Sequence, residues 1–190
     1  APGRVDARRM CELAAVALGC EPAEVLVCST GLIGIPLPMA PLETGIPAVA
    51  RVLSADKAGG ARAAEAIMTT DTRMKLAGRA VRIGGVEVTL AALAKGAGMI
   101  APELATMLVF VVTDAAITTD ALAGCIRRAS DASFNHLTVD DDMSTNDVAL
   151  VLANGLAENP VIEGHGDAMI AFEDALTSLC LEMARAIAED

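Results

Sequence analysis

The residues of this chain best suited to chemistry are Ala105 and Thr106, which lie in the run Lys95-Gly-Ala-Gly-Met-Ile-Ala-Pro-Glu-Leu-Ala-Thr-Met-Leu-Val-Phe. A threonine here follows a small residue and opens an apolar, β-prone stretch. This arrangement suits a self-cleaving peptide bond, because the hydroxyl of Thr106 can attack the carbonyl of Ala105 and form an ester that water opens. Thr106 would then be an amino terminus whose hydroxyl is the nucleophile and whose own α-amine, with a reference pKa of about 8, is the base.

A simpler interpretation of the same stretch is a glycine loop that leads into a buried strand, since Ala-Thr is a common pair. Other segments bear on the choice, and they follow one another in a definite order. They are Cys28-Ser-Thr-Gly-Leu-Ile-Gly34 with Pro36-Leu-Pro-Met39, Met68-Thr-Thr-Asp-Thr72, the stretch from Lys95 to Leu108, and Ser133-Phe-Asn with Thr138-Val-Asp and Ser144-Thr-Asn-Asp147. Together these segments resemble the ornithine acetyltransferase family, the glutamate N-acetyltransferases of arginine biosynthesis. The resemblance runs from about Asp6 to the end of the chain.

The resemblance implies an α/β fold of the α+β type, an N-terminal-nucleophile-like αββα sandwich of two stacked sheets flanked by helices. It implies one partial acetyltransferase domain over residues 1–190, cleaved between residues 105 and 106. Acetyl would pass from N-acetylornithine to Thr106 and then to glutamate, without a cofactor; acetyl-CoA would be a co-substrate only in a bifunctional enzyme. After cleavage, two α and two β pieces are expected to form a heterotetramer.

The resemblance also assigns roles to single residues. Thr30 and Gly31 match the oxyanion-hole pair, and Thr69 and Lys95 match residues that bind substrate together with Thr106. A glycine lets the backbone approach a developing oxyanion closely, and a lysine offers a counter-charge to a substrate carboxylate. From the residues alone, an ordinary turn at Thr30 and a strand-end lysine that reaches solvent at Lys95 remain open.

Departures from the family pattern leave two other functions open. Glu103-Leu104 stands where the family more often has Asn-Met. Segments that the family has before the part matching Asp6 and after the part matching Asp190, including one with a substrate-binding glutamate, are expected to be missing, which would leave this piece nearly inactive by itself. The alternatives are a related self-processing amidohydrolase or aminopeptidase, with water as the acceptor, and a truncated remnant that is not an enzyme.

Composition excludes several partners. The formal net charge is −11, which argues against nucleic acid and anionic membranes because phosphate binding needs clustered Lys and Arg. No apolar run reaches the roughly 18 residues of a membrane span. The five cysteines contain no CxxC pair, which favours reduced, buried thiols and a cytoplasmic location. Asp140-Asp-Asp142 is interpreted as a solvated acidic turn, and no metal site is expected.

Hydrophobic periodicity predicts a mixed succession of helices and strands. Two β-prone runs joined by Gly84-Gly85 predict a hairpin. Helices are expected over residues 5–19, 39–53, 57–67, 118–130 and 167–188, and strands over residues 24–28, 79–83, 86–90, 106–112, 134–139 and 148–153. Thr119 or Asp120 is the expected cap of the fourth helix. The last helix is expected to bury one face made of Ile170, Leu176, Leu179, Met183 and Ile187.

Overall fold

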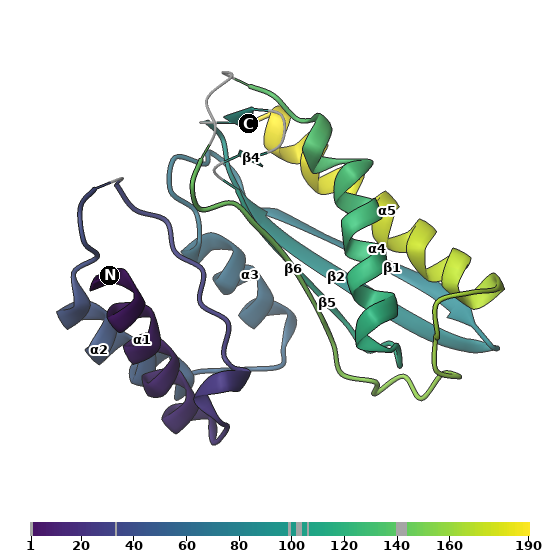
Figure 1. Ribbon diagram of the computed structural model, residues 1–190, viewed down its shortest axis with the longest axis horizontal. Coiled ribbons are helices and arrows are strands. Elements are labelled where there is room, and N and C mark those ends of the chain that lie inside the picture. The colour runs from purple at the N-terminus through teal and green to yellow at the C-terminus, as the bar shows by residue number, and fades with distance from the viewer. Residues whose placement is uncertain (1, 33, 99, 102–103, 106, 140–143) are drawn as a thin grey trace. The chain divides into compact units, whose positions relative to one another are not determined.

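The computed structural model describes residues 2–32, 34–98, 100–101, 104–105, 107–139 and 144–190 (Figure 1). The chain forms two compact units, residues 1–60 and 61–190. The first unit is helical, and the second contains a four-stranded sheet with two long helices. The single domain expected over residues 1–190 stays a prediction.

The first unit is built on two packed helices, α1 (Pro2–Leu18) and α2 (Met39–Ala50). α1 ends at Gly19, whose φ of 75° lies in the left-handed region that glycine adopts most easily. α2 contains Pro47 without ending there. Both predicted helices are therefore confirmed, as is the next, α3 (Lys57–Ala66).

The strand predicted over residues 24–28 is wrong. A 3₁₀ helix, η1 (Pro22–Glu24), occupies its start, and residues 25–32 follow as irregular chain. Leu26 is 61% exposed. Residues with a high β-propensity form a strand only where a neighbouring strand supplies the ladder, and the described residues of this unit contain none.

The second unit is organised by a mixed sheet of β1 (Lys75–Ile83), β2 (Val86–Lys95), β5 (Leu108–Thr113) and β6 (Val148–Ala153), in the order β1-β2-β5-β6. The hairpin β1–β2 is confirmed, and Gly84 and Gly85 form its turn with φ values of 59° and 87°. β5 runs antiparallel to β2 and parallel to β6. A separate two-stranded pair joins β3 (Ile100–Ala101) to β4 (Leu104–Ala105).

Two helices, α4 (Thr119–Asp131) and α5 (Asp167–Ala188), pack on one face of this sheet. The core between them includes Val88 and Leu90 of the sheet and Phe172 of α5. The side chain of Thr118 accepts the hydrogen bond that caps α4, so neither Thr119 nor Asp120 is the cap. On α5 the expected apolar face is buried apart from Ile170, which is 59% exposed.

The strand predicted over residues 134–139 is also wrong. Residues Phe134–His136 form a 3₁₀ helix, η2, directly after α4. Ser133 donates its hydroxyl to the carbonyl of Ala129 at 2.5 Å, which turns the chain, and Phe134 is buried in the core. Burial of the Phe134 ring against α4 and α5 therefore outweighs the alternation of apolar and polar residues that predicted a strand here.

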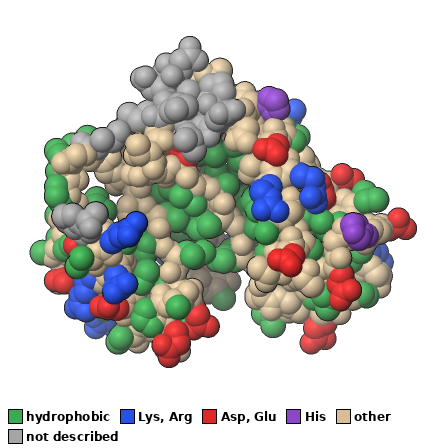
Figure 2. Space-filling view, viewed as in Figure 1, with side chains coloured by type: hydrophobic (Ala, Val, Ile, Leu, Met, Phe, Trp, Pro, Cys, Tyr) green, Lys and Arg blue, Asp and Glu red, His purple; other side chains and the backbone are tan. Residues whose placement is uncertain are grey.

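The opposite face of the sheet is apolar and partly exposed. Leu76, Val112 and Leu152 are 50%, 51% and 54% exposed, so the runs at 106–112 and 148–153 are less buried than their composition indicates. Figure 2 shows hydrophobic side chains at the surface among scattered charged ones. The α/β class is confirmed, whereas the second stacked sheet of an αββα sandwich stays a prediction. Among the described helices, none is long and apolar enough to cross a membrane.

Candidate functional site

Lys95 is the last residue of β2, opposite Leu108 in the ladder with β5. It is only 1% exposed, so it is not a strand-end lysine reaching solvent. Its Nζ lies 3.4 Å from Oγ1 of Thr69. The structure thus brings together the two residues that were predicted to bind substrate, although they are 26 positions apart.

Burial lowers the pKa of the Lys95 ammonium, and the charge of Lys75 lowers it further. The carboxylates of Asp71 and Asp147 act in the opposite direction. A buried lysine that is only partly compensated can bind an anion strongly, because a further carboxylate would restore the missing counter-charge.

Asp71 binds the backbone of Thr69 and of Gly96, the residue after Lys95, and sequence reasoning assigned it no role. Its Oδ2 accepts a hydrogen bond from the amide of Thr69 at 3.0 Å, and its Oδ1 accepts one from the amide of Gly96 at 2.7 Å. The loop before β1 and the end of β2 are therefore joined through one carboxylate. The only signal in the sequence was its place in Met68-Thr-Thr-Asp-Thr72.

A second buried lysine completes this cluster. The Nζ of Lys75 lies 2.7 Å from Oδ1 of Asp71 and also forms an ion pair with Asp190. Burial alone would raise the pKa of Asp71, but the hydrogen bonds from Gly96, Lys75 and Thr69 together lower it. Hydrogen bonds from Lys75 and Thr72 lower the pKa of Asp190. The carboxyl groups of Asp71 and Asp190 are therefore ionised in the neutral pH range.

Asp147 is a second carboxylate whose charge acts on Lys95. Its Oδ1 accepts a hydrogen bond from the amide of Met107 at 2.8 Å. Burial raises the pKa of its carboxyl to about 6, while that hydrogen bond and the charge of Lys95 lower it. In the sequence Asp147 belongs to the motif Ser144-Thr-Asn-Asp147, which carries the family resemblance but assigns this residue no role.

The other predicted site residues are Ala105, Thr106, Thr30 and Gly31. Thr106 lies outside the described residues, and of the predicted cleavage site only the backbone of Ala105, in β4, is described. Thr30 and Gly31 belong to the first unit, where Thr30 lines a cavity of about 320 Å³ together with Cys28 and Leu37. Their role as an oxyanion hole stays a prediction.

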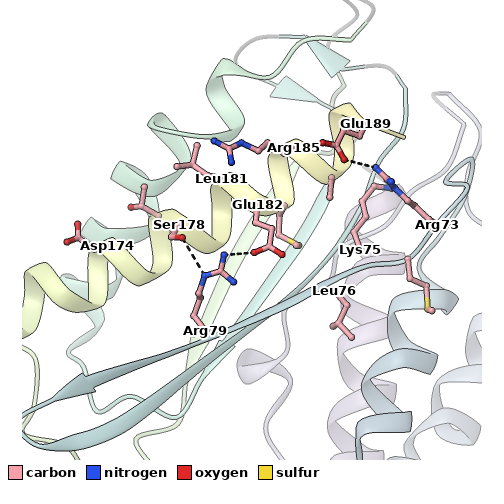
Figure 3. Close-up of a pocket in the computed structure, with 14 residues that line it drawn as sticks. Arg73, Lys75, Leu76, Arg79, Asp174, Ser178, Leu181, Glu182, Arg185 and Glu189 are labelled. Carbon is pink, nitrogen blue, oxygen red and sulfur yellow. Dashed lines mark hydrogen bonds and ion pairs between the residues drawn. The ribbon is translucent and has the colours of Figure 1, made fainter.

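A cavity of about 790 Å³ lies elsewhere, between β1 and α5 (Figure 3). Arg79 binds Ser178 and Glu182 there, and Arg73 binds Glu189 at 3.1 Å. These side chains are largely exposed, and such pairs contribute little to stability. Neither Thr69 nor Lys95 lines this cavity, so its size does not make it the reactive site.

The cysteines and the described acidic residues were considered as sites of thiol or metal chemistry. All five cysteines are free thiols; Cys125 and Cys180 are buried, and burial raises their pKa values to about 11 and about 12. The other three are half-buried rather than buried. Burial also raises the pKa of Cys28, which disfavours a nucleophilic thiolate. Within the described ranges no group of three His, Cys, Asp or Glu could hold a metal, and residues 140–142 lie outside them.

The fold and this cluster define an α/β protein in which a buried lysine, Lys95, lies 3.4 Å from the hydroxyl of an exposed threonine, Thr69, and pairs with the first residue of an inner strand, β5. The chain belongs to the ArgJ family, whose profile matches residues 1–190. This confirms the resemblance drawn from the motifs.

Curated relatives match almost the whole chain. The arginine biosynthesis bifunctional protein ArgJ of Symbiobacterium thermophilum is 54% identical over 99% of this chain and 46% of its own length. The protein of the same name from Geobacter sulfurreducens is 49% identical over 99% and 47%. That from Pseudomonas syringae pv. tomato is 44% identical over 100% and 46%. The chain spans about half the length of the curated relatives it matches.

Proposed function

We propose that this chain carries the nucleophile and part of the substrate site of a glutamate N-acetyltransferase of arginine biosynthesis. Its relatives are named arginine biosynthesis proteins, and the family match covers the full chain. The structural observation that carries the proposal is the pairing of Thr69 with the buried Lys95, with Asp71 bound to the amides of Thr69 and of Gly96, the residue after Lys95.

Lys95 suits this reaction because both substrates share one charged group. N-acetylornithine and glutamate each carry an α-carboxylate at the same place relative to the nitrogen that loses or gains acetyl. One buried ammonium can therefore hold the donor in the first half-reaction and the acceptor in the second. The burial that lowers the pKa of Lys95 makes such a counter-charge more favourable.

The chemistry begins with self-processing between Ala105 and Thr106. The Thr106 hydroxyl attacks the Ala105 carbonyl, the peptide C–N bond breaks, and water hydrolyses the resulting ester to a free Ala105 carboxylate. The released α-amine of Thr106 then acts as the base for its own hydroxyl.

Acetyl transfer follows in two balanced steps. In the first, the Thr106 oxygen attacks the acetyl carbonyl of N-acetylornithine, its proton passes through the amine to the leaving nitrogen, and ornithine departs. In the second, the amine of glutamate attacks the acetyl ester and the proton returns to Thr106. One amide is exchanged for another, so no cofactor or energy source is needed. Thr30 and Gly31 would stabilise the oxyanion in both steps.

The test uses the full-length protein and its Thr106→Ala variant. Intact mass should show a fragment ending at Ala105 and one beginning at Thr106 in the wild type, and a single uncleaved chain in the variant. The wild type should convert N-acetylornithine and glutamate to ornithine and N-acetylglutamate. Release of acetate alone would favour the amidohydrolase, and no reaction would favour the remnant. Glutamate with acetyl-CoA tests whether the enzyme is bifunctional.

Family membership also leads us to propose a heterotetramer and a cytoplasmic location. Native mass spectrometry of the cleaved protein should show two α and two β pieces. A cytoplasmic enzyme is expected to keep its five thiols reduced, which thiol titration of the freshly isolated protein would measure.

A further inference from the structure

Two buried lysines lie on neighbouring strands of the sheet, and their surroundings differ. Lys75 and Lys95 are 2% and 1% exposed, although lysine is almost never fully buried unless it is paired. Lys75 is paired, because its Nζ lies 2.7 Å from Oδ1 of Asp71 and also binds Asp190. Nζ of Lys95, by contrast, makes its one hydrogen bond to a described residue with the hydroxyl of Thr69, at 3.4 Å. Among the residues that the structure describes, no carboxylate is bound directly to Lys95.

The two lysines leave the sheet on opposite faces. Lys75 pairs with Ala94 in the ladder of β1 and β2, and Lys95 is the next residue of β2. Paired residues share a face and successive residues alternate between faces. Lys75 lies on the face that α5 covers, where it binds Asp190 just after the end of that helix. Lys95 therefore lies on the other face, which it shares with the half-exposed Leu76.

Asp71 connects the two lysines. Its Oδ1 accepts hydrogen bonds from Nζ of Lys75 and from the amide of Gly96, each at 2.7 Å, and its Oδ2 accepts one from the amide of Thr69 at 3.0 Å. Three described donors therefore bind this carboxylate, and Lys95 is not among them. The negative charge of Asp71 still stabilises the Lys95 ammonium, whereas the positive charge of Lys75 has the opposite effect. Lys75 thus offsets at Lys95 part of what Asp71 contributes.

We propose that Lys75 is a positioning residue for substrate binding: by pairing with Asp71 it keeps that carboxylate from neutralising Lys95, whose ammonium stays available for the α-carboxylate of the substrate. This inference rests on the proposed function. An ammonium that is already paired with a carboxylate gains little from a second one, whereas an unpaired ammonium gains a charge-assisted hydrogen bond. Lys75 acts through Asp71 and Lys95, from the face of the sheet opposite to Lys95.

The test measures KM and kcat for N-acetylornithine and glutamate in the full-length protein and in its Lys75→Gln variant. Gln keeps a hydrogen-bond donor for Asp71 and removes the charge. KM for both substrates should rise about 10-fold, because the charge of Asp71 then competes with the substrate carboxylate for Lys95, and kcat should change less. Circular dichroism checks the fold. Lys57→Gln, which replaces an exposed lysine at the start of α3, should behave as wild type.

Two double variants separate this role from a merely structural one. Lys75→Gln combined with Asp71→Asn removes the competing charge and keeps an acceptor oxygen for the amide of Gly96, so KM should return toward the wild-type value. Lys75→Gln combined with Asp190→Asn removes the other carboxylate that binds Lys75. Its KM should stay raised, because Asp71 still competes for Lys95. Each double variant removes one buried ion pair, so a purely structural loss would affect both alike.

The outcomes distinguish this inference from the proposed function. If wild type forms no N-acetylglutamate, the proposed function fails and this inference fails with it. If wild type is active and folded Lys75→Gln has the KM of wild type, this inference alone fails. Equal KM values in the two double variants would overturn it as well, and that comparison stands even if Lys75→Gln by itself does not fold.

Discussion

Replacement of Asp71 by alanine is expected to weaken both the fold and the substrate site. The change removes the acceptor of three hydrogen bonds, from the amides of Thr69 and Gly96 and from Nζ of Lys75. The buried amide of Gly96 is left without this partner, at roughly 1–3 kcal/mol, and the part-buried amide of Thr69 at less. Among the described residues Lys75 keeps its ion pair with Asp190, and breaking a buried ion pair from one side costs about 3–5 kcal/mol. These costs overlap, so the free energy of unfolding should fall by about 3–5 kcal/mol in total.

The assay is urea unfolding of the full-length protein, followed by circular dichroism, with Asp174→Asn as the control. The hydrogen bonds to Asp71 lower its pKa below the reference value of 3.8. Its stabilisation is therefore fully present above about pH 4 and is lost as the pH falls through the lower folded pKa. The difference between wild type and variant should be constant from pH 5 to 8 and should shrink in stronger acid. A midpoint within error of wild type at pH 7 would refute the assignment of Asp71 as the centre of this cluster.

Three further predictions concern single side chains. Lys95→Met should raise KM for N-acetylornithine and for glutamate together, by about 10- to 100-fold, because one charge-assisted contact is lost; a change for one substrate alone would contradict a shared carboxylate site. Thr30→Ala should lower kcat by about 10- to 1000-fold with a smaller change in KM, and an effect confined to KM would assign Thr30 to substrate binding. Asp147→Asn, measured in an uncleaved Thr106→Ala background, should stabilise the protein by about 1–2 kcal/mol at pH 8, since the folded carboxyl has a pKa of about 6 against a reference of 3.8. That gain should disappear as the pH falls from 6 to 4, and an equal gain at both ends of this range would exclude titration of Asp147 as its source.

Elements with a strong local pattern could be predicted from the sequence. The hairpin is marked by Gly84-Gly85, and α5 by a helical period that only Ile170 breaks. In both cases the element that neighbouring residues favour is also the element that packs in the folded chain. The predicted strands at 24–28 and 134–139 failed because β-propensity has no effect without a partner strand, and the tertiary structure provides none there among the described residues.

In the candidate site, too, some residues could be predicted from the sequence and others could not. The motifs identified Thr69 and Lys95, whose residue types and order carry the resemblance, and the sequence by itself determined the family and the chemistry to be expected. Only the tertiary structure showed that Asp71 joins Thr69 to Gly96, the residue after Lys95, and that Asp147 binds Met107. The contacts of Asp71 with Gly96 and of Asp147 with Met107 bridge 25 and 40 positions. A periodic pattern within one segment carries no information about contacts between residues so far apart in the sequence. A carboxylate in a polar motif looks the same in the sequence whether it ends exposed to solvent or buried beside a lysine, and burial determines its pKa and its role.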